Sequence, residues 1–160
     1  MKIDRSEMYI LINIRNKYVK IADLEPDRIR MSIDAKNEGP DYVKQDISDI
    51  VLLFNDRFVT LTRCGLITLW KFNTFREEAN SIYEIQLKRD LSEGVYEEFL
   101  NMAICERGNH LTIFSTFGNL MNRSRIFMVW ITETDYMYLI AEKKLKADNL
   151  TKPKIIVEEE

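Results

Sequence analysis

The stretch Asp49–Phe72, which reads DIVLLFNDRFVTLTRCGLITLWKF, decides the fold class of this 160-residue chain. Residues Ile47–Phe54 form a nearly continuous apolar run, as expected for a strand that is buried on both faces. An Asn-Asp turn signal leads to a second strand over Phe58–Leu61, and a glycine-containing turn leads to a third strand over Leu66–Phe72. Strands joined by such short turns predict an antiparallel meander.

The same kind of pattern continues on both sides of this stretch. Alternating or β-rich segments predict further strands over residues 8–14, 18–24, 28–33, 81–88, 110–115, 125–131 and 135–141. The polar residues 34–46 predict a long surface loop. We therefore expect an all-β protein built from antiparallel four-stranded meanders, with residues 1–145 as a single β domain and 146–160 as a charged C-terminal tail.

The segment 92–107 supports two interpretations. Ser92 is a good helix N-cap, Gly108 resembles a C-terminal stop, and apolar residues between them line one helical face. This interpretation gives an α+β fold with a helix near 92–107. The alternative makes Phe99–Cys105 a strand that is followed by a hairpin loop at Arg107-Gly108-Asn109, and the β-rich surroundings favour it.

A second stretch repeats the order of elements of the first. Asn101–Ile131 reads NMAICERGNHLTIFSTFGNLMNRSRIFMVWI, with a strand, a polar turn, a second strand, a second turn and a third strand that ends in Trp. Trp70 and Trp130, which end the two third strands, are 60 residues apart. The earlier segment 18–24 fits the third strand of a preceding unit, with Ala22 in the Trp position. The repeating unit is therefore a group of four strands.

These units resemble the WD-repeat β-propeller family, whose blades are four antiparallel strands over roughly 40–45 residues. The matching segments are Ile50–Phe54, Phe58–Thr62 and Cys64–Trp70 in one copy, and Leu100–Ile104, Leu111–Ser115 and Arg125–Trp130 in the other. The resemblance implies about three blades, whereas a closed propeller has typically 4–8. It therefore implies an incomplete ring, with other protein subunits or further copies of the chain as partners.

The chain departs from the family at several motif positions. Lys71 and Ile131 stand where the family has Asp after Trp, and Cys64 stands where it has Asp before the turn Gly. No Gly-His dipeptide precedes either copy, and the second copy has an insertion around Asn119–Arg123. The blades that the resemblance implies are therefore degenerate.

The residues that usually carry chemistry do not form a motif. Cys64 and Cys105 lack the paired spacing of a zinc site, and His110, the one histidine, has no acidic partner at a motif spacing. We expect two reduced, partly buried thiols, no catalytic, cofactor or metal-binding residues, and hence no enzyme. The expected function is a non-catalytic protein–protein interaction module or a subunit of a larger assembly.

Five further residues are candidates for binding or for structure. Arg107, Arg123 and Arg125 are interleaved with aromatic residues and form the candidate partner-binding group. In the alternative function, an α+β domain binds RNA, DNA or a small ligand through this Arg-rich face, although 23 basic against 26 acidic residues argue against a dedicated nucleic-acid binder. Trp70 and Trp130 are expected to be structural, packing between sheets.

The N-terminal segment bears on localisation. Its apolar run, Met8–Ile12, is shorter than the roughly 7–15 residues of a signal-peptide core. The run Ile126–Ile131 is far below the about 20 residues of a membrane span. We expect an intracellular protein, cytoplasmic or nuclear, without a membrane partner.

Overall fold

The computed structural model describes residues 2–3, 9–14, 18–23, 28–34, 46–73, 76, 78–89, 97–105, 107–117 and 120–146. The first strands are β1 (Lys2–Ile3), β2 (Tyr9–Ile14), β3 (Tyr18–Asp23) and β4 (Arg28–Asp34). They are followed by β5 (Ile47–Leu53), β6 (Arg57–Thr62), β7 (Leu66–Asn73) and β8 (Glu78–Gln86). The last are β9 (Glu97–Ile104), β10 (His110–Phe117), β11 (Leu120–Ile131) and β12 (Met137–Lys146).

The strands form three sheets, and each sheet is an antiparallel meander of four consecutive strands. The expected all-β class is therefore confirmed. The segment YVKIADL does contain the third strand of a preceding four-stranded unit, as the repeat predicted. Across the described part of the chain there is no helix, and so none long and apolar enough to cross a membrane.

The α+β alternative is wrong where the structure tests it. Residues 97–104 are the strand β9, so the helix expected near 92–107 does not form there. A β-bulge in the pairing of β9 with β10 places the buried Phe99 and Met102 three residues apart. The residues Phe99, Leu100 and Ala103, which would share one face of the predicted helix, do not share one environment in the strand, because Phe99 is buried while Leu100 and Ala103 are exposed.

Several predicted boundaries also differ from the structure. Residues 120–124, expected in a polar turn region with an insertion, belong to the long strand β11. Lys146, expected in the C-terminal tail, ends β12, and residues 147–160 lie outside the described part of the chain. Residues 35–45 of the expected surface loop also lie outside it.

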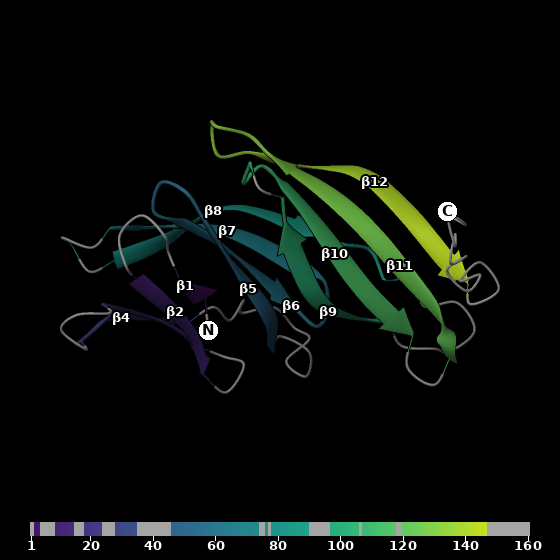
Figure 1. Ribbon diagram of the computed structural model, residues 1–160, viewed down its shortest axis with the longest axis horizontal. Coiled ribbons are helices and arrows are strands. Elements are labelled where there is room, and N and C mark those ends of the chain that lie inside the picture. The colour runs from purple at the N-terminus through teal and green to yellow at the C-terminus, as the bar shows by residue number, and fades with distance from the viewer. Residues whose placement is uncertain are drawn as a thin grey trace, which may run out of the picture.

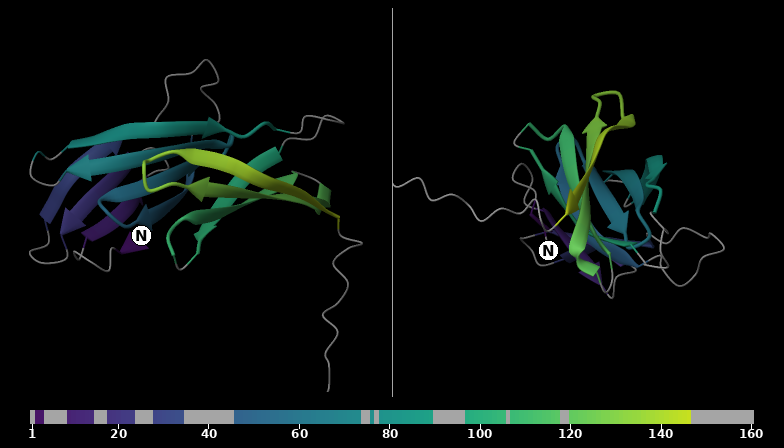
Figure 2. Two further views of the ribbon diagram at one scale, coloured as in Figure 1. Left: turned by 90° about the horizontal axis from the view of Figure 1, so that it is seen from above. Right: turned by 90° about the vertical axis from the view of Figure 1, so that its right-hand side faces the viewer.

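The three sheets follow one another along the molecule in sequence order (Figures 1 and 2). The first strand of the middle sheet, β5, lies against β9 of the last sheet and against β1 and β2 of the first. The last strands β8 and β12 also meet. The sheets therefore stack in one orientation, with first strand next to first strand.

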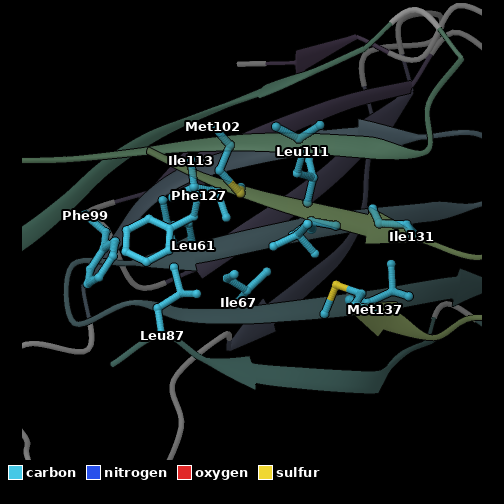
Figure 3. Packing of buried hydrophobic residues seen from close by; sticks show 14 of the residues in the cluster. Leu61, Ile67, Leu87, Phe99, Met102, Leu111, Ile113, Phe127, Ile131 and Met137 are labelled. Atoms are coloured by element: carbon cyan, nitrogen blue, oxygen red, sulfur yellow. The ribbon is translucent and has the colours of Figure 1, made fainter. Parts of the chain in front are cut away.

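The main core lies between the middle sheet and the last sheet (Figure 3). The middle sheet contributes β5, β6 and β7 side chains such as Val59 and Leu69, and the last sheet contributes β9 to β12 side chains such as Phe127 and Val129. A smaller second core lies on the opposite face of the middle sheet. Its buried members are Ile47, Ile50, Phe58 and Phe72.

Polar contacts add to the apolar packing between these two sheets. The Asp49 carboxylate of β5 accepts a 2.8 Å hydrogen bond from the backbone N–H of Met102 on β9. Arg57 at the start of β6 forms a 3.0 Å ion pair with Asp135, in the turn between β11 and β12. The backbone N–H of Phe99 donates to the carbonyl of Arg63 at 3.0 Å. Each contact holds the last sheet in register on the middle one.

Candidate interaction surface

Strand β11 presents apolar side chains on both faces of the last sheet. Phe127, Val129 and Ile131 are buried in the main core. Met128 and Trp130 alternate with them and are 37% and 41% exposed. Because successive side chains of a strand point to opposite faces, the exposed pair faces away from the middle sheet.

Cross-strand pairing extends this exposed row over the neighbouring strands. Phe114 pairs with Ile126, and Tyr138 pairs with Trp130, so all of them share the face of Met128. Phe114 and Tyr138 are exposed, and Ile126 is half-buried. We call this surface the outer face, and its members are Phe114, Ile126, Met128, Trp130 and Tyr138.

Two β-bulges add apolar residues beside the outer face. The pairing of β10 with β9 leaves Leu100 without a partner position, and the pairing of β11 with β12 leaves Ile140 without one. Both side chains are exposed, by 42% and 49%. Exposed apolar side chains therefore occur on all four strands of the last sheet, next to polar ones such as Asn101 opposite Phe114 and Lys143 opposite Ile126. A patch of this kind on a folded domain indicates an interaction site.

Trp130 and Tyr138 lie together on the outer face. Their ring centroids are 5.9 Å apart and the rings are tilted by 32°. Large aromatic side chains with few rotatable bonds bury much area when a partner binds, at a low cost in conformational entropy. This pair is therefore the part of the face best suited to contribute binding energy.

Trp70 occupies a different environment on the middle sheet. Its ring stacks on Phe58 with centroids 5.9 Å apart and packs against the second core. The indole N–H donates a 2.9 Å hydrogen bond to the hydroxyl of Thr60. Trp70 therefore packs on the second core of its own sheet and is oriented by this hydrogen bond. Trp130 does not fill the core as expected, because its side chain lies on the outer face.

The pairing pattern explains why the two tryptophans differ. Phe58 pairs with Trp70 in the middle sheet, on the face that carries the second core. In the last sheet, the face toward the preceding sheet carries the pair Leu111 and Val129. Val129, not Trp130, therefore corresponds to Trp70. A shift of one residue moves a side chain to the opposite face of a sheet.

Arg125 lies inside the protein, in contrast to its predicted binding role. The side chain is 6% exposed and forms ion pairs with Glu97 and Glu142. Its Nε donates to Glu97 at 2.7 Å, and one Nη atom donates to the backbone carbonyl of Lys88 at 2.7 Å. Glu97 is fully buried and also accepts a 2.5 Å hydrogen bond from Ser115. This cluster fixes five segments of the chain to one another, which are β9, β10, β11, β12 and the residues after β8.

The charge of Arg125 is maintained by these carboxylates. Burial lowers the pKa of the guanidinium, but hydrogen bonds and charge attraction from Glu97 and Glu142 outweigh it, so the pKa is raised. The guanidinium also lies 4.7 Å from the centroid of the Phe127 ring. These contacts occupy the Arg125 guanidinium inside the protein.

The structure does not gather the predicted arginines into one face. Arg107 is exposed in the turn between β9 and β10, beside the start of β10. Arg125 pairs with Ser115, near the opposite end of β10. The side chain of Arg123 lies outside the described part of the chain, although its backbone belongs to β11.

The hairpin between β9 and β10 brings the second cysteine next to the histidine. Cys105 donates a 3.2 Å hydrogen bond to Asn109, and the same Asn109 oxygen lies 2.9 Å from Nδ1 of His110. Burial raises the pKa of the Cys105 thiol, but backbone hydrogen bonds at Asn109, His110, Arg107 and Gly108 together outweigh it, so the pKa is lowered. Both cysteines are free, with Cys64 half-buried and Cys105 exposed. The described residues contain no cluster of three or more potential metal ligands.

Comparisons with known proteins give little further information. No protein-family model matches the chain, and no curated protein matches it. Among solved structures the chain is similar to a protein from Lactobacillus plantarum, with 8% sequence identity and a TM-score of 0.44. The match covers 90% of this chain, which spans 56% of that protein. A similarity at this level identifies neither fold nor function.

The outer face was missed at the level of sequence, although a signal for it is present. The run Ile126–Ile131 contains no polar residue, so one face of β11 must carry apolar side chains wherever the other is buried. Only the packing of the sheets decides which face is covered, and that arrangement involves residues far apart in the chain.

Proposed function

We propose that this protein is a non-catalytic protein–protein interaction module, and that its outer face is the surface that docks a protein partner. The observation that carries the proposal is the exposure of Met128, Trp130 and Tyr138 on one face of the last sheet. Burying apolar area stabilises a complex by about 25 cal/mol per Å² before the costs of association. Leaving the same apolar surface exposed to water gives no such stabilisation.

The arrangement of the sheets supports a finer form of the proposal. Three antiparallel meanders stack with β5 against β9 and against β1, as blades do around a propeller axis. The protein is then a piece of a propeller-like ring with degenerate WD-type blades, acting as a subunit of a larger assembly. The departures at Lys71 and Cys64 agree with blades that are held together by apolar packing.

The chemistry of the outer face indicates the kind of partner. Its five members are apolar or aromatic, the pairing places the polar Asn101 opposite Phe114 and Lys143 opposite Ile126 on the same face, and the whole chain has a net charge of only -3. A partner is therefore recognised by shape and apolar area, with little electrostatic steering. The alternative of nucleic-acid binding gains no support from Arg125, because Glu97 and Glu142 occupy its guanidinium.

The proposal includes an intracellular location, cytoplasmic or nuclear. The two free thiols of Cys64 and Cys105 support it, because disulfides form readily in secreted proteins and are rare in the cytosol.

The test compares two charge substitutions at positions of equal exposure. Met128 on the outer face and Ile82 on β8 are both 37% exposed. Three tagged proteins would be expressed in cells of the organism that encodes the chain: wild type, Met128→Glu and Ile82→Glu. The size of each tagged species would then be measured in cell extracts prepared without denaturant. Wild type and Ile82→Glu are expected in complexes larger than the 19.0 kDa chain, and Met128→Glu as the free chain. Equal behaviour of all three proteins contradicts the proposal.

A further inference from the structure

We infer that the partner of the outer face is the β1–β4 sheet of a second copy of this chain, stacked head to tail, so that two copies close one ring of six sheets. The inference rests on the proposed function and names the partner that the surface fits. Its starting point is how the chain already covers a surface of the same kind within itself.

The corresponding face of the middle sheet shows what such a surface binds. Val59 and Leu69 pair across β6 and β7 on the face that turns to the last sheet, and both are fully buried in the main core. The pair at the same position in the last sheet is Thr112 and Met128. On the middle sheet, this face is covered by another four-stranded meander, whose first strand β9 lies against β5. The occupant expected on the outer face is therefore a four-stranded antiparallel sheet.

The first sheet of the chain supplies such an occupant. It has the same four-stranded antiparallel order, and its strands β1 and β2 lie next to β5. Its pairing aligns two neighbouring apolar rows, which are Leu11, Ile21 and Met31, and Ile10, Ala22 and Ile29. Neighbouring positions of a strand alternate between the two faces.

The stacking direction determines how two copies would meet. Within the chain, each sheet presents one face to the sheet before it and the other face to the sheet after it. A contact between the last sheet of one copy and the first sheet of the next continues this order and is heterologous. A heterologous contact closes when its rotation returns to the start, and six sheets lie within the typical 4–8 blades of propellers. In a ring of two copies, the last sheet of each copy then packs against the first sheet of the other.

The size of the outer face fits such an interface. Eight-residue strands at about 3.3 Å per residue and four strands at about 4.8 Å spacing give a flat footprint of about 500 Å². Projecting side chains enlarge the accessible area toward the about 800 Å² per partner that stable complexes bury. A two-copy ring contains this contact twice, and the second contact forms within an already joined pair, at a high effective concentration.

The alternative of two outer faces packed on each other leaves the β1–β4 sheets at both ends of the dimer uncovered. Head-to-tail stacking covers both kinds of face with one contact and uses the arrangement already present between β5 and β9. Lys144 on the edge strand β12 is exposed, and charged edge residues oppose growth by edge-to-edge pairing. Growth is therefore directed through the faces of the sheets.

The first measurement is the mass of the purified full chain by light scattering across a concentration series. Wild type and Ile82→Glu are expected at twice 19.0 kDa, and Met128→Glu and Trp130→Glu at 19.0 kDa. Circular dichroism and thermal unfolding check that each variant remains folded. Both substituted side chains are exposed, so both variants are expected to fold. If a glutamate variant unfolds, Met128→Ser takes its place, and the same loss of dimer is expected.

The second measurement separates head-to-tail stacking from face-to-face stacking. A tagged Met128→Glu chain still offers an intact β1–β4 sheet, so it is expected to capture untagged wild type through the outer face of the wild-type chain. Two Met128→Glu chains are expected not to bind each other. In a face-to-face dimer, the Met128→Glu chain binds neither itself nor wild type.

The outcomes distinguish this inference from the proposed function. Capture of wild type by Met128→Glu, together with a monomeric Met128→Glu, supports head-to-tail stacking. A dimeric wild type without such capture overturns it and leaves the outer face as a self-association surface. A monomeric purified wild type also overturns it, while a larger complex in cell extracts that depends on Met128 leaves the proposed function standing.

Discussion

The middle sheet, β5–β8, and the last sheet, β9–β12, share one topology but differ in how their faces are used. The middle sheet is covered by both neighbours, and all six residues of β6 are buried. The last sheet is covered on one face only, and β11 alternates between buried Phe127 and exposed Met128. The difference teaches that apolar residues on both faces of a strand do not by themselves show that both faces are covered within the chain.

The largest expected effect concerns the buried ion cluster that holds the last sheet together. Arg125→Met leaves the fully buried Glu97 without its charge partner, so the free energy of unfolding should fall by about 3–5 kcal/mol. Urea unfolding measures the loss. The double variant Arg125→Met, Glu97→Gln should recover part of it. An equal or greater loss in the double variant would show that the charge left behind is not the cause.

A second comparison concerns the turn glycines of the two sheets. Gly65 has a φ of +89°, and an added Cβ would lie 2.5 Å from the Phe99 ring, which is fully buried. Gly65→Ala should therefore cost about 2–3 kcal/mol. Gly108 has a φ of +71°, but its Cβ would meet Phe54, a side chain that is 55% exposed and free to move. Gly108→Ala should cost only about 1 kcal/mol. Thermal unfolding of both variants checks the order, and a larger loss at Gly108 would reverse it.

The two tryptophans give the sharpest comparison of the sheets. Trp70→Ala removes the stack on Phe58 and the hydrogen bond to Thr60, and should lower the free energy of unfolding by about 2–3 kcal/mol. Trp130→Ala removes an exposed ring, and the monomer should lose less than about 1 kcal/mol. Unfolding should be followed in urea at low protein concentration. If Trp130→Ala destabilises the monomer as much as Trp70→Ala, the distinction between a structural and a docking tryptophan fails.

The smallest expected effect is chemical and concerns the hairpin at one end of the outer face. Because backbone hydrogen bonds lower the pKa of the Cys105 thiol, the folded protein should keep thiolate at a lower pH than the unfolded chain does. As the pH is lowered, alkylation of Cys105 should therefore persist to a lower pH in the folded protein than in the unfolded chain. Mass spectrometry after timed iodoacetamide treatment, with and without urea, checks this. Identical pH profiles in the two states would contradict the assignment.

The sequence predicted most of the strands because their signal is local. Short turns and continuous apolar runs placed β5, β6 and β7 close to their observed bounds. The signal failed where the regular alternation is interrupted. At β9 the apolar residues Phe99, Leu100 and Ala103 are spaced like residues on a helix face, and a bulge at Leu100 interrupts the alternation. At β11 the strand continues through polar residues that indicated a turn.

The candidate site was less predictable, since it depends on packing between sheets. Matching Trp70 to Trp130 was natural from the sequence, yet the observed pairing shifts the correspondence to Val129 and places Trp130 on the opposite face. Arg125 was expected at a surface because its carboxylate partners, Glu97 and Glu142, lie 28 and 17 residues away and on different strands. Neither relation has a signal in the local sequence.

The most direct test of the central claim is the mass of wild type and Trp130→Glu in solution, measured side by side by light scattering. The claim is that the outer face of β9–β12 is covered in the working protein by the first sheet of a second copy. It predicts twice 19.0 kDa for wild type and 19.0 kDa for Trp130→Glu, with both proteins folded. The same mass for both proteins would contradict it.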